Sequence, residues 1–240
     1  MFFDEHERFL DTGTVFTARH RLNLRHKAII ERNTDVLKGA RVLDIASHDG
    51  RWSFAALKAG ASHVVGVEAR PDVVESSRES MAAEGFDESQ YEFVQGDIFE
   101  VMANNKFDVD VVLCLGFLYH TYRHTELLSA IRALEPQHLL IDTTVTLSDD
   151  PILRLRRDYP SNAGQAVLDT YAYGNYSLVA RPSAPAVRMM VEAYGFEVES
   201  EVDWPSLIKE HRHIPERPKE ARVGDYRKGT RVTMRAKSLV

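Results

Sequence analysis

Residues 41–68 constrain the fold more than any other stretch of this chain. A short apolar run, 42–45, leads into a small loop that ends at Gly50. A helical pattern follows, and a second apolar run, 64–67, ends in Glu68. Strand, loop, helix and strand in this order predict one mononucleotide-binding half of a doubly wound sheet, with backbone N–H groups aimed at a ligand. Glu68 stands where a carboxylate takes both hydroxyls of a ribose.

The loop resembles the first motif of class I S-adenosylmethionine-dependent methyltransferases, which reads acid-x-G-x-G-x-G. Asp44 takes the acid position and Gly50 the last glycine, whereas Ala46 and His48 replace the other two glycines. A pyrophosphate needs several bare N–H groups, so these departures favour a sulfonium ligand over NAD. Taken alone, the loop also fits an ordinary strand–helix turn that binds nothing.

Two later acids strengthen the resemblance. Asp97 follows an alternating run, 91–95, and in the family an acid at this place accepts a hydrogen bond from the adenine amino group, while the next residue, Ile98, packs on the purine. Ligands of such sheets bind at the carboxyl ends of the strands, where Asp44, Glu68 and Asp97 all lie. The resemblance thus implies S-adenosylmethionine as cofactor, with S-adenosylhomocysteine as product. The implied cofactor-binding residues are Asp44, Ala46, His48, Gly50, Glu68, Asp97, Ile98 and Leu115.

Length and composition agree with one soluble α/β domain. The chain has 240 residues with 44% hydrophobic content, which is enough for one sizeable core, and it has no apolar run long enough to span a bilayer. With a single cysteine, Cys114, and an acidic N-terminus, we expect a cytoplasmic protein without a membrane partner. The net charge of −6 argues mildly against a nucleic-acid partner. The oligomeric state is not indicated.

The expected fold is a single doubly wound, Rossmann-like α/β sheet of seven mostly parallel strands with an antiparallel last strand. The last run, 230–236, alternates as an antiparallel edge strand does, and residues 204–228 read as a polar loop. The domain, 1–240, divides into an N-terminal helical lid (1–40), a cofactor-binding core (41–145), an acceptor-pocket insertion (146–181) and the C-terminal part of the sheet (182–240).

The residues after the fourth predicted strand suggest candidates for the catalytic base. Residues 116–120 read GFLYH, and the strand end there faces the donor methyl group in the resembled family. Transfer to a hydroxyl needs a base, and an imidazole titrates near neutral pH, so His120 is the first candidate for the catalytic base. Asp142, at the end of strand five, is the second candidate and would orient an imidazole, hold the acceptor or bind a metal. A histidine that only caps a helix is the alternative for His120. No close pair of acids marks a metal site, so a divalent metal is compatible with the sequence but not indicated.

The acceptor is expected to be a small molecule or oligosaccharide. The nearest resemblance is to the sugar O-methyltransferases of bacterial methylated polysaccharide pathways of the methylmannose type, and a weaker one is to tRNA wobble-uridine carboxymethyl transferases. We therefore favour O-methylation of a sugar, with a tRNA-modifying alkyl transferase and a non-catalytic S-adenosylmethionine-binding protein as alternatives. Aromatic and basic side chains suit a polyhydroxylated acceptor. The candidate substrate-binding residues are Tyr119, His124, Arg156, Tyr173 and Tyr176.

Overall fold

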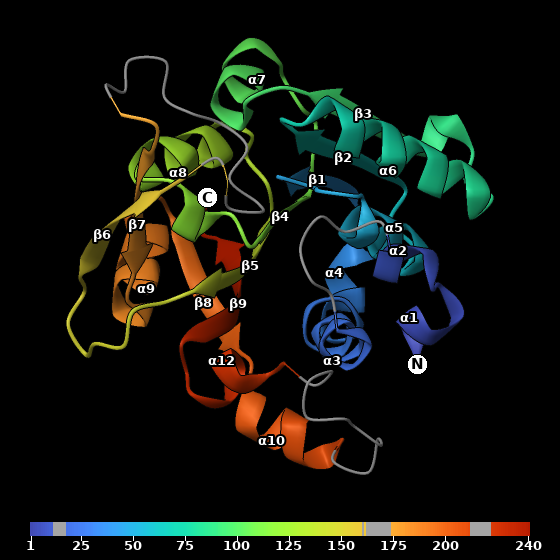
Figure 1. Cartoon of the computed structure of the whole chain (residues 1–240). Helices are drawn as coiled ribbons and strands as arrows, with labels where there is room; N and C mark the ends of the chain where they lie inside the picture. The colour runs from blue at the N-terminus through green and yellow to red at the C-terminus, as the bar shows by residue number, and fades with distance from the viewer. Residues whose placement is uncertain (12–17, 160, 162–173, 212–221) are drawn as a thin grey trace.

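A seven-stranded sheet forms the centre of the computed structural model, which describes residues 1–11, 18–159, 161, 174–211 and 222–240 (Figure 1). The strand order is β3-β2-β1-β4-β5-β9-β8. The strands are β1 (Arg41–Ile45), β2 (His63–Glu68), β3 (Tyr91–Gln95), β4 (Val111–Leu115), β5 (His138–Thr144), β8 (Phe196–Glu201) and β9 (Arg231–Ser238).

The strand directions confirm the predicted fold class. Strands β1 to β5 pair in parallel, and β9 runs antiparallel to both β5 and β8. Parallel strands are covered on both faces, which is why β4 reads as an unbroken apolar run, VVLCL. Alternate residues of that run enter different cores: Val111 and Leu113 pack on one side of the sheet, and Val112 and Cys114 on the other.

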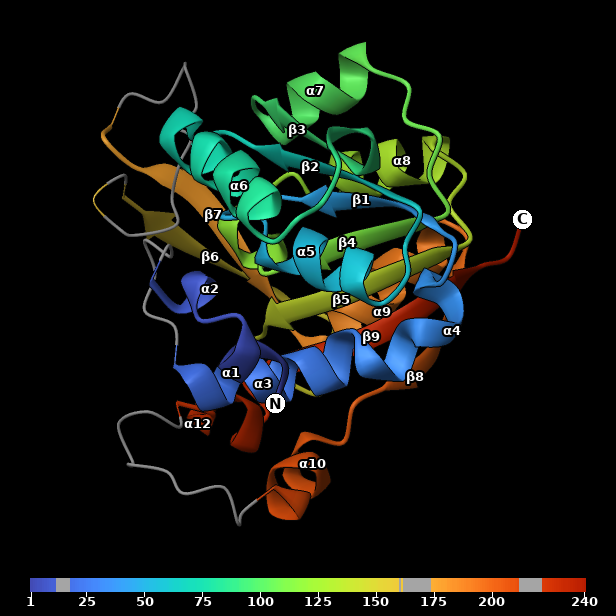
Figure 2. The ribbon, with the colours of Figure 1, turned by 90° about the vertical axis from the view of Figure 1, so that its right-hand side faces the viewer.

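Helices cover both faces of the sheet (Figure 2). One core takes its helical residues from α1 to α6, α10 and α12, and the opposite core takes them from α7, α8 and α9. The α-helices are α1 (Phe2–Glu5), α2 (Arg8–Asp11), α3 (Arg19–Ile29), α4 (Thr34–Leu37), α5 (Arg51–Lys58), α6 (Pro71–Ala83), α7 (Ile98–Asn104), α8 (His124–Ala133), α9 (Ala184–Ala193), α10 (Trp204–Glu210) and α12 (Gly224–Arg227). Three 3₁₀ turns are η1 (Glu31–Asn33), η2 (Glu88–Gln90) and η3 (Leu118–His120). No helix in the described part of the chain is long and apolar enough to cross a membrane.

Two features differ from the sequence prediction. The segment predicted as an insertion contains a separate antiparallel pair of strands, β6 (Leu153–Asp158) and β7 (Ser177–Pro182). Figure 2 shows this pair beyond the carboxyl ends of β4 and β5. The segment predicted as a polar loop contains α10 and α12, which are held together by stacking of Trp204 on Tyr226 with ring centroids 3.6 Å apart. Both helices are too short to produce a clear helical period in the sequence.

Candidate active site

The loop between β1 and α5 keeps the backbone conformation of a glycine-rich motif although it has lost two glycines. Ala46, His48 and Gly50 all have positive φ, at 53°, 54° and 75°. Only glycine adopts this region without steric cost. Gly50 also meets a packing limit, because a Cβ there would lie 2.9 Å from Cζ of Phe93. The loop therefore has the backbone conformation of the motif. Ala46 and His48 adopt this conformation at a cost in backbone strain, because neither is glycine.

Asp44 lies beneath this loop in an environment that favours the neutral acid. Its carboxyl is 1% exposed and accepts a hydrogen bond from Ser53 Oγ of α5 at 2.7 Å. Burial, and to a smaller extent the carboxylates of Asp49 and Glu68, raise the pKa of Asp44 to about 7 against the hydrogen bonds from Ser53. Three acidic side chains therefore gather at this end of the sheet, and two of them, Asp49 and Glu68, pair with Arg51 and Arg70.

Glu68 ends β2 and faces the same loop. The side chain is 4% exposed, and its Oε2 accepts a hydrogen bond from the backbone N–H of His48 at 3.1 Å. Its Oε1 accepts from the backbone N–H and from Nε of Arg70, at 3.1 and 2.9 Å. These contacts fix the carboxylate at the strand end, and Oε2, which accepts one of these hydrogen bonds, keeps lone-pair capacity for a further donor.

The other predicted cofactor residues lie at the ends of β3 and β4. Asp97 begins α7 as its N-cap, with Oδ1 accepting from the backbone N–H of Phe99 at 2.8 Å. Ile98 is buried, and Leu115 is half-buried at the last position of β4. Because β1, β2, β3 and β4 are neighbouring parallel strands, these residues share the edge that holds Asp44 and Glu68.

His120 ends the η3 turn that follows β4, and its partner comes from β6. Nδ1 of His120 lies 3.1 Å from Oδ2 of Asp158. An ionised carboxylate only accepts hydrogen bonds, so Nδ1 carries the proton in this pair. The side chains are 22% and 15% exposed. The tyrosine beside it, Tyr119, lies with its ring centroid 4.3 Å from the imidazole. Asp158 was not predicted as a site residue, because 38 residues separate it from His120 and no local motif links the two.

Asp142 has an environment that does not suit a proton acceptor. Its carboxylate is 0% exposed and takes hydrogen bonds from Arg25 Nη2 at 2.9 Å and from Nε and Nη2 of Arg231. Tyr226 Oη at 2.8 Å and Thr233 Oγ1 at 2.7 Å donate to its other oxygen. Burial by itself would raise the pKa of Asp142, but the charges of Arg231 and Arg25 hold it well below its ordinary value. This geometry makes Asp142 the counter-ion of two buried arginines that join α3, β5 and β9.

The predicted substrate-binding residues are not all brought together. His124 is 1% exposed, its Nε2 lies 2.8 Å from the carbonyl oxygen of Leu118, and burial lowers its pKa, so it holds the η3 turn in place. Tyr176 packs against Arg157, whose Cζ lies 4.9 Å from the ring centroid. Arg156 is exposed on the opposite face of β6 from Arg157. Tyr173 lies outside the described residues.

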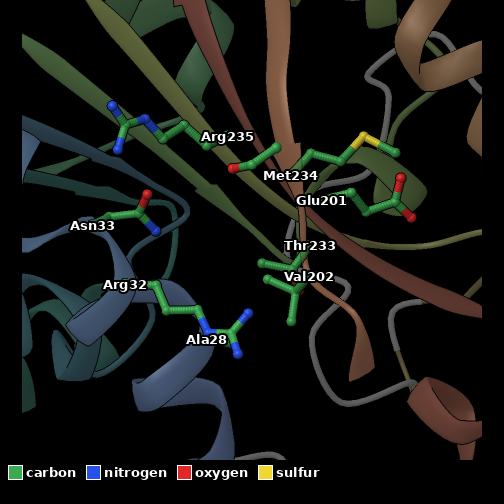
Figure 3. Close-up of a pocket in the computed structure, with 9 residues that line it drawn as sticks. Ala28, Arg32, Asn33, Glu201, Val202, Thr233, Met234 and Arg235 are labelled. Carbon is green, nitrogen blue, oxygen red and sulfur yellow. The ribbon is translucent and has the colours of Figure 1, made fainter. Parts of the chain in front are cut away.

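A small hollow lies away from these strand ends. It measures about 60 Å³ and is lined by residues of α3, η1, β8 and β9 and their neighbours (Figure 3). In Figure 3, Arg32 and Asn33 lie on one side of it and Val202 and Thr233 on the other. Ligand pockets usually measure roughly 300–1,000 Å³, so this hollow does not accommodate a nucleoside-sized cofactor. In the described part of the chain, no group of three His, Cys, Asp or Glu side chains is placed to hold a metal ion.

Comparison with known proteins identifies the domain type. Residues 37–176, more than half of the 240, match a family model described as a methyltransferase domain. Among curated proteins, ribosomal RNA large subunit methyltransferase I of Aeromonas hydrophila is 32% identical over 80 residues, which is 31% of this chain and 20% of that protein. The match therefore spans only about a fifth of the length of that relative.

Solved structures share the fold over most of the chain. The N-terminal domain of EvdMO1, in the presence of SAH and D-fucose, is 16% identical with a TM-score of 0.56, covering 87% of this chain and 79% of that one. A 1,6-didemethyltoxoflavin-N1-methyltransferase of Burkholderia thailandensis, with bound 1,6-didemethyltoxoflavin and S-adenosylhomocysteine, is 19% identical with a TM-score of 0.58, covering 99% and 83%. At such identities the likeness concerns the fold alone.

Proposed function

The chain belongs to the methyltransferase domain family, and from this premise we propose that it transfers the methyl group of S-adenosylmethionine to a hydroxyl of a sugar or short oligosaccharide. The bound cofactor supplies a methyl group on a sulfonium, and S-adenosylhomocysteine is the product. The pair formed by His120 and Asp158 is the observation that carries the proposal. It supplies a base for a hydroxyl proton at the edge of the sheet where the cofactor residues converge.

The cofactor-binding edge is built from side chains that fit this donor. Glu68, fixed by His48 and Arg70, accepts hydrogen bonds from the ribose hydroxyls. Asp97 uses one oxygen to cap α7 and offers the other to the adenine amino group. Ile98 and Leu115 provide apolar surface for the purine.

His120 accepts the hydroxyl proton. Because Asp158 faces Nδ1 of the imidazole, the acceptor hydroxyl is placed at the other ring nitrogen, Nε2. Asp158, which is half-buried, also stabilises the imidazolium that forms. Asp158 is a positioning residue, and β6, which contains it, forms part of the acceptor side of the site. Helix α3 forms part of a helical cover, from which Arg25 reaches Asp142.

Two observations support a sugar as the acceptor. Tyr119 next to His120 provides an aromatic face and a hydroxyl of the kind that binds sugar rings. The structural neighbour EvdMO1 was crystallised in the presence of D-fucose. The matched curated relative is a ribosomal RNA methyltransferase, which makes RNA the second candidate acceptor.

The test compares turnover and donor binding in the same variants. We expect His120→Ala to lose about 10²–10⁴-fold in methyl transfer from labelled S-adenosylmethionine to a panel of monosaccharides that includes D-mannose and D-fucose. Affinity for S-adenosylhomocysteine, measured by calorimetry, should stay unchanged. Asp158→Asn should lower turnover and alter its pH profile, with Asp158→Glu restoring part of both. Normal turnover in His120→Ala would remove the proposed base, and no turnover in the wild-type protein with any sugar would favour RNA or a non-catalytic role.

A further inference from the structure

Three arginines lie on one face of the β6–β7 sheet, and we name Arg154, Arg156 and Arg181 the arginine face. Side chains alternate along a strand, and residues opposite each other in an antiparallel pair share a face. The register places Arg154 opposite Arg181 and Asp158 opposite Ser177. Arg154, Arg156 and Asp158 are two residues apart along β6, so the same face carries all three together with Arg181.

The arginine face is turned toward the proposed base. Asp158, on the same face, contacts His120 of η3 at 3.1 Å. The charge of Arg181 interacts with Tyr119, the neighbour of His120. Tyr119 in turn lies beside Gly116 at the end of β4, where a Cβ would be 3.8 Å from its hydroxyl. The arginines, Tyr119 and His120 therefore border one region beyond β4.

Among the described residues, these arginines form no ion pair with an acid, unlike most other described arginines. In the described residues, ion pairs join Arg21 to Asp225, Arg51 to Asp49, Arg70 to Glu68, Arg123 to Glu126 and Arg231 to Asp142. No described carboxylate forms such a pair with the arginine face, whose one acid, Asp158, pairs with His120.

Arg181 shows the consequence of this arrangement. Its Nε is buried without a hydrogen-bond acceptor among the described residues. Burial, together with the charges of Arg156 and Arg154, lowers the pKa of Arg181, so the three cations repel one another. Asp158 is the one acid that the described residues place on this face, and it contacts His120. A cluster of guanidinium groups with no ion-pair partner among the described residues, beside a base, fits an anion that comes with the ligand.

We propose that Arg156 and Arg181, with the hydroxyl of Tyr119, bind an anionic group of the acceptor, a carboxylate or a phosphate, and thereby hold a neighbouring hydroxyl of the same molecule at His120. The acceptor is then an acidic or phosphorylated sugar rather than a neutral one. This inference rests on the proposed function, because it concerns the acceptor of the same site. Guanidinium groups bind carboxylate and phosphate through paired hydrogen bonds, which gives the acceptor both affinity and orientation.

Binding without methyl transfer tests the inference separately from catalysis. The full chain, saturated with S-adenosylhomocysteine, is titrated with glucose, glucuronate and glucose 6-phosphate in a calorimeter. We expect at least one anionic sugar to bind about ten- to a hundredfold more tightly than glucose, the usual gain from charge-assisted hydrogen bonds. The tighter of the two anionic sugars identifies carboxylate or phosphate as the recognised group.

Arg157→Gln is the matched control for Arg156→Gln, because both arginines lie on β6 but on opposite faces. Arg156→Gln and Arg181→Gln should abolish the preference for the anionic sugar, whereas Arg157→Gln should keep it. Arg156 is exposed, so its variant should fold normally even if Arg181→Gln does not.

Equal affinities for glucose and both anions, no binding by either anion at millimolar concentration, or an equal loss in Arg157→Gln would overturn the inference. Methylation of a neutral sugar with no anion preference would leave the proposed function standing without it. Tighter binding of a short RNA than of either sugar would point to nucleic acid instead.

Discussion

Replacing Asp142 with asparagine should destabilise the protein strongly. The carboxylate is fully buried and is the counter-ion of Arg25 and Arg231, whose side chains are 11% and 7% exposed. Asparagine keeps the shape but removes the charge, so two buried guanidinium groups lose their counter-ion. The amide NH₂ would also face donors such as Tyr226 or Thr233.

The expected loss follows from the burial of this network. Removing one partner of a buried ion pair costs about 3–5 kcal/mol of unfolding free energy. At about 2.1 cal/mol/K of unfolding entropy per residue, a chain of 240 residues loses roughly 2 °C in Tm for each kcal/mol, so Tm should fall by about 6–10 °C. Because Arg231 and Arg25 lower the folded-state pKa of Asp142, its contribution is fully present above the unfolded pKa near 4 and disappears as pH falls below that value.

Urea unfolding of Asp142→Asn at pH 7 and at pH 3 measures both effects. The difference from wild type should be largest at pH 7 and smaller at pH 3. Asp35→Asn is the control, because Asp35 also pairs with an arginine, Arg235 at 2.8 Å, but is 61% exposed and should contribute at most about 1 kcal/mol. Equal small losses in the two variants would refute the reasoning. Loss of turnover without loss of stability would instead return Asp142 to the role of catalytic base.

Three further outcomes are expected. Glu68→Ala should weaken S-adenosylhomocysteine binding by about 1.5–3 kcal/mol in calorimetry, while Glu75→Ala, exposed on α6, should leave it unchanged; equal affinities would exclude Glu68 from the donor site. Ala46→Gly should stabilise the protein by about 0.5–1 kcal/mol in urea unfolding, since glycine relieves the positive φ, and a loss of stability would contradict this. Turnover on a sugar should change less than about tenfold between 50 and 200 mM salt, whereas a steeper fall would indicate RNA.

The backbone of the cofactor edge could be predicted from the sequence because its signals are local. The apolar run before Asp44, the loop to Gly50 and the run ending in Glu68 each identify an element within a few residues, and the structure forms β1, α5 and β2 there. The positive φ at Ala46 and His48 follows from their places in a glycine motif. The alternating run 230–236 likewise predicted the antiparallel β9.

Partnerships between distant residues were decided by the tertiary structure alone. His120 and Asp158 are 38 residues apart, and Asp142 and Arg231 are 89 apart, so no period or motif links them. In the sequence, Asp142 therefore resembles the other acids at strand ends. The chain topology, however, surrounds it with arginines from α3 and β9. The arginines of β6 likewise look like a solvated basic run until pairing with β7 turns Arg154 and Arg156 to the side of Arg181. Local sequence determines backbone elements, whereas the partners of a buried charge depend on which elements the fold brings together.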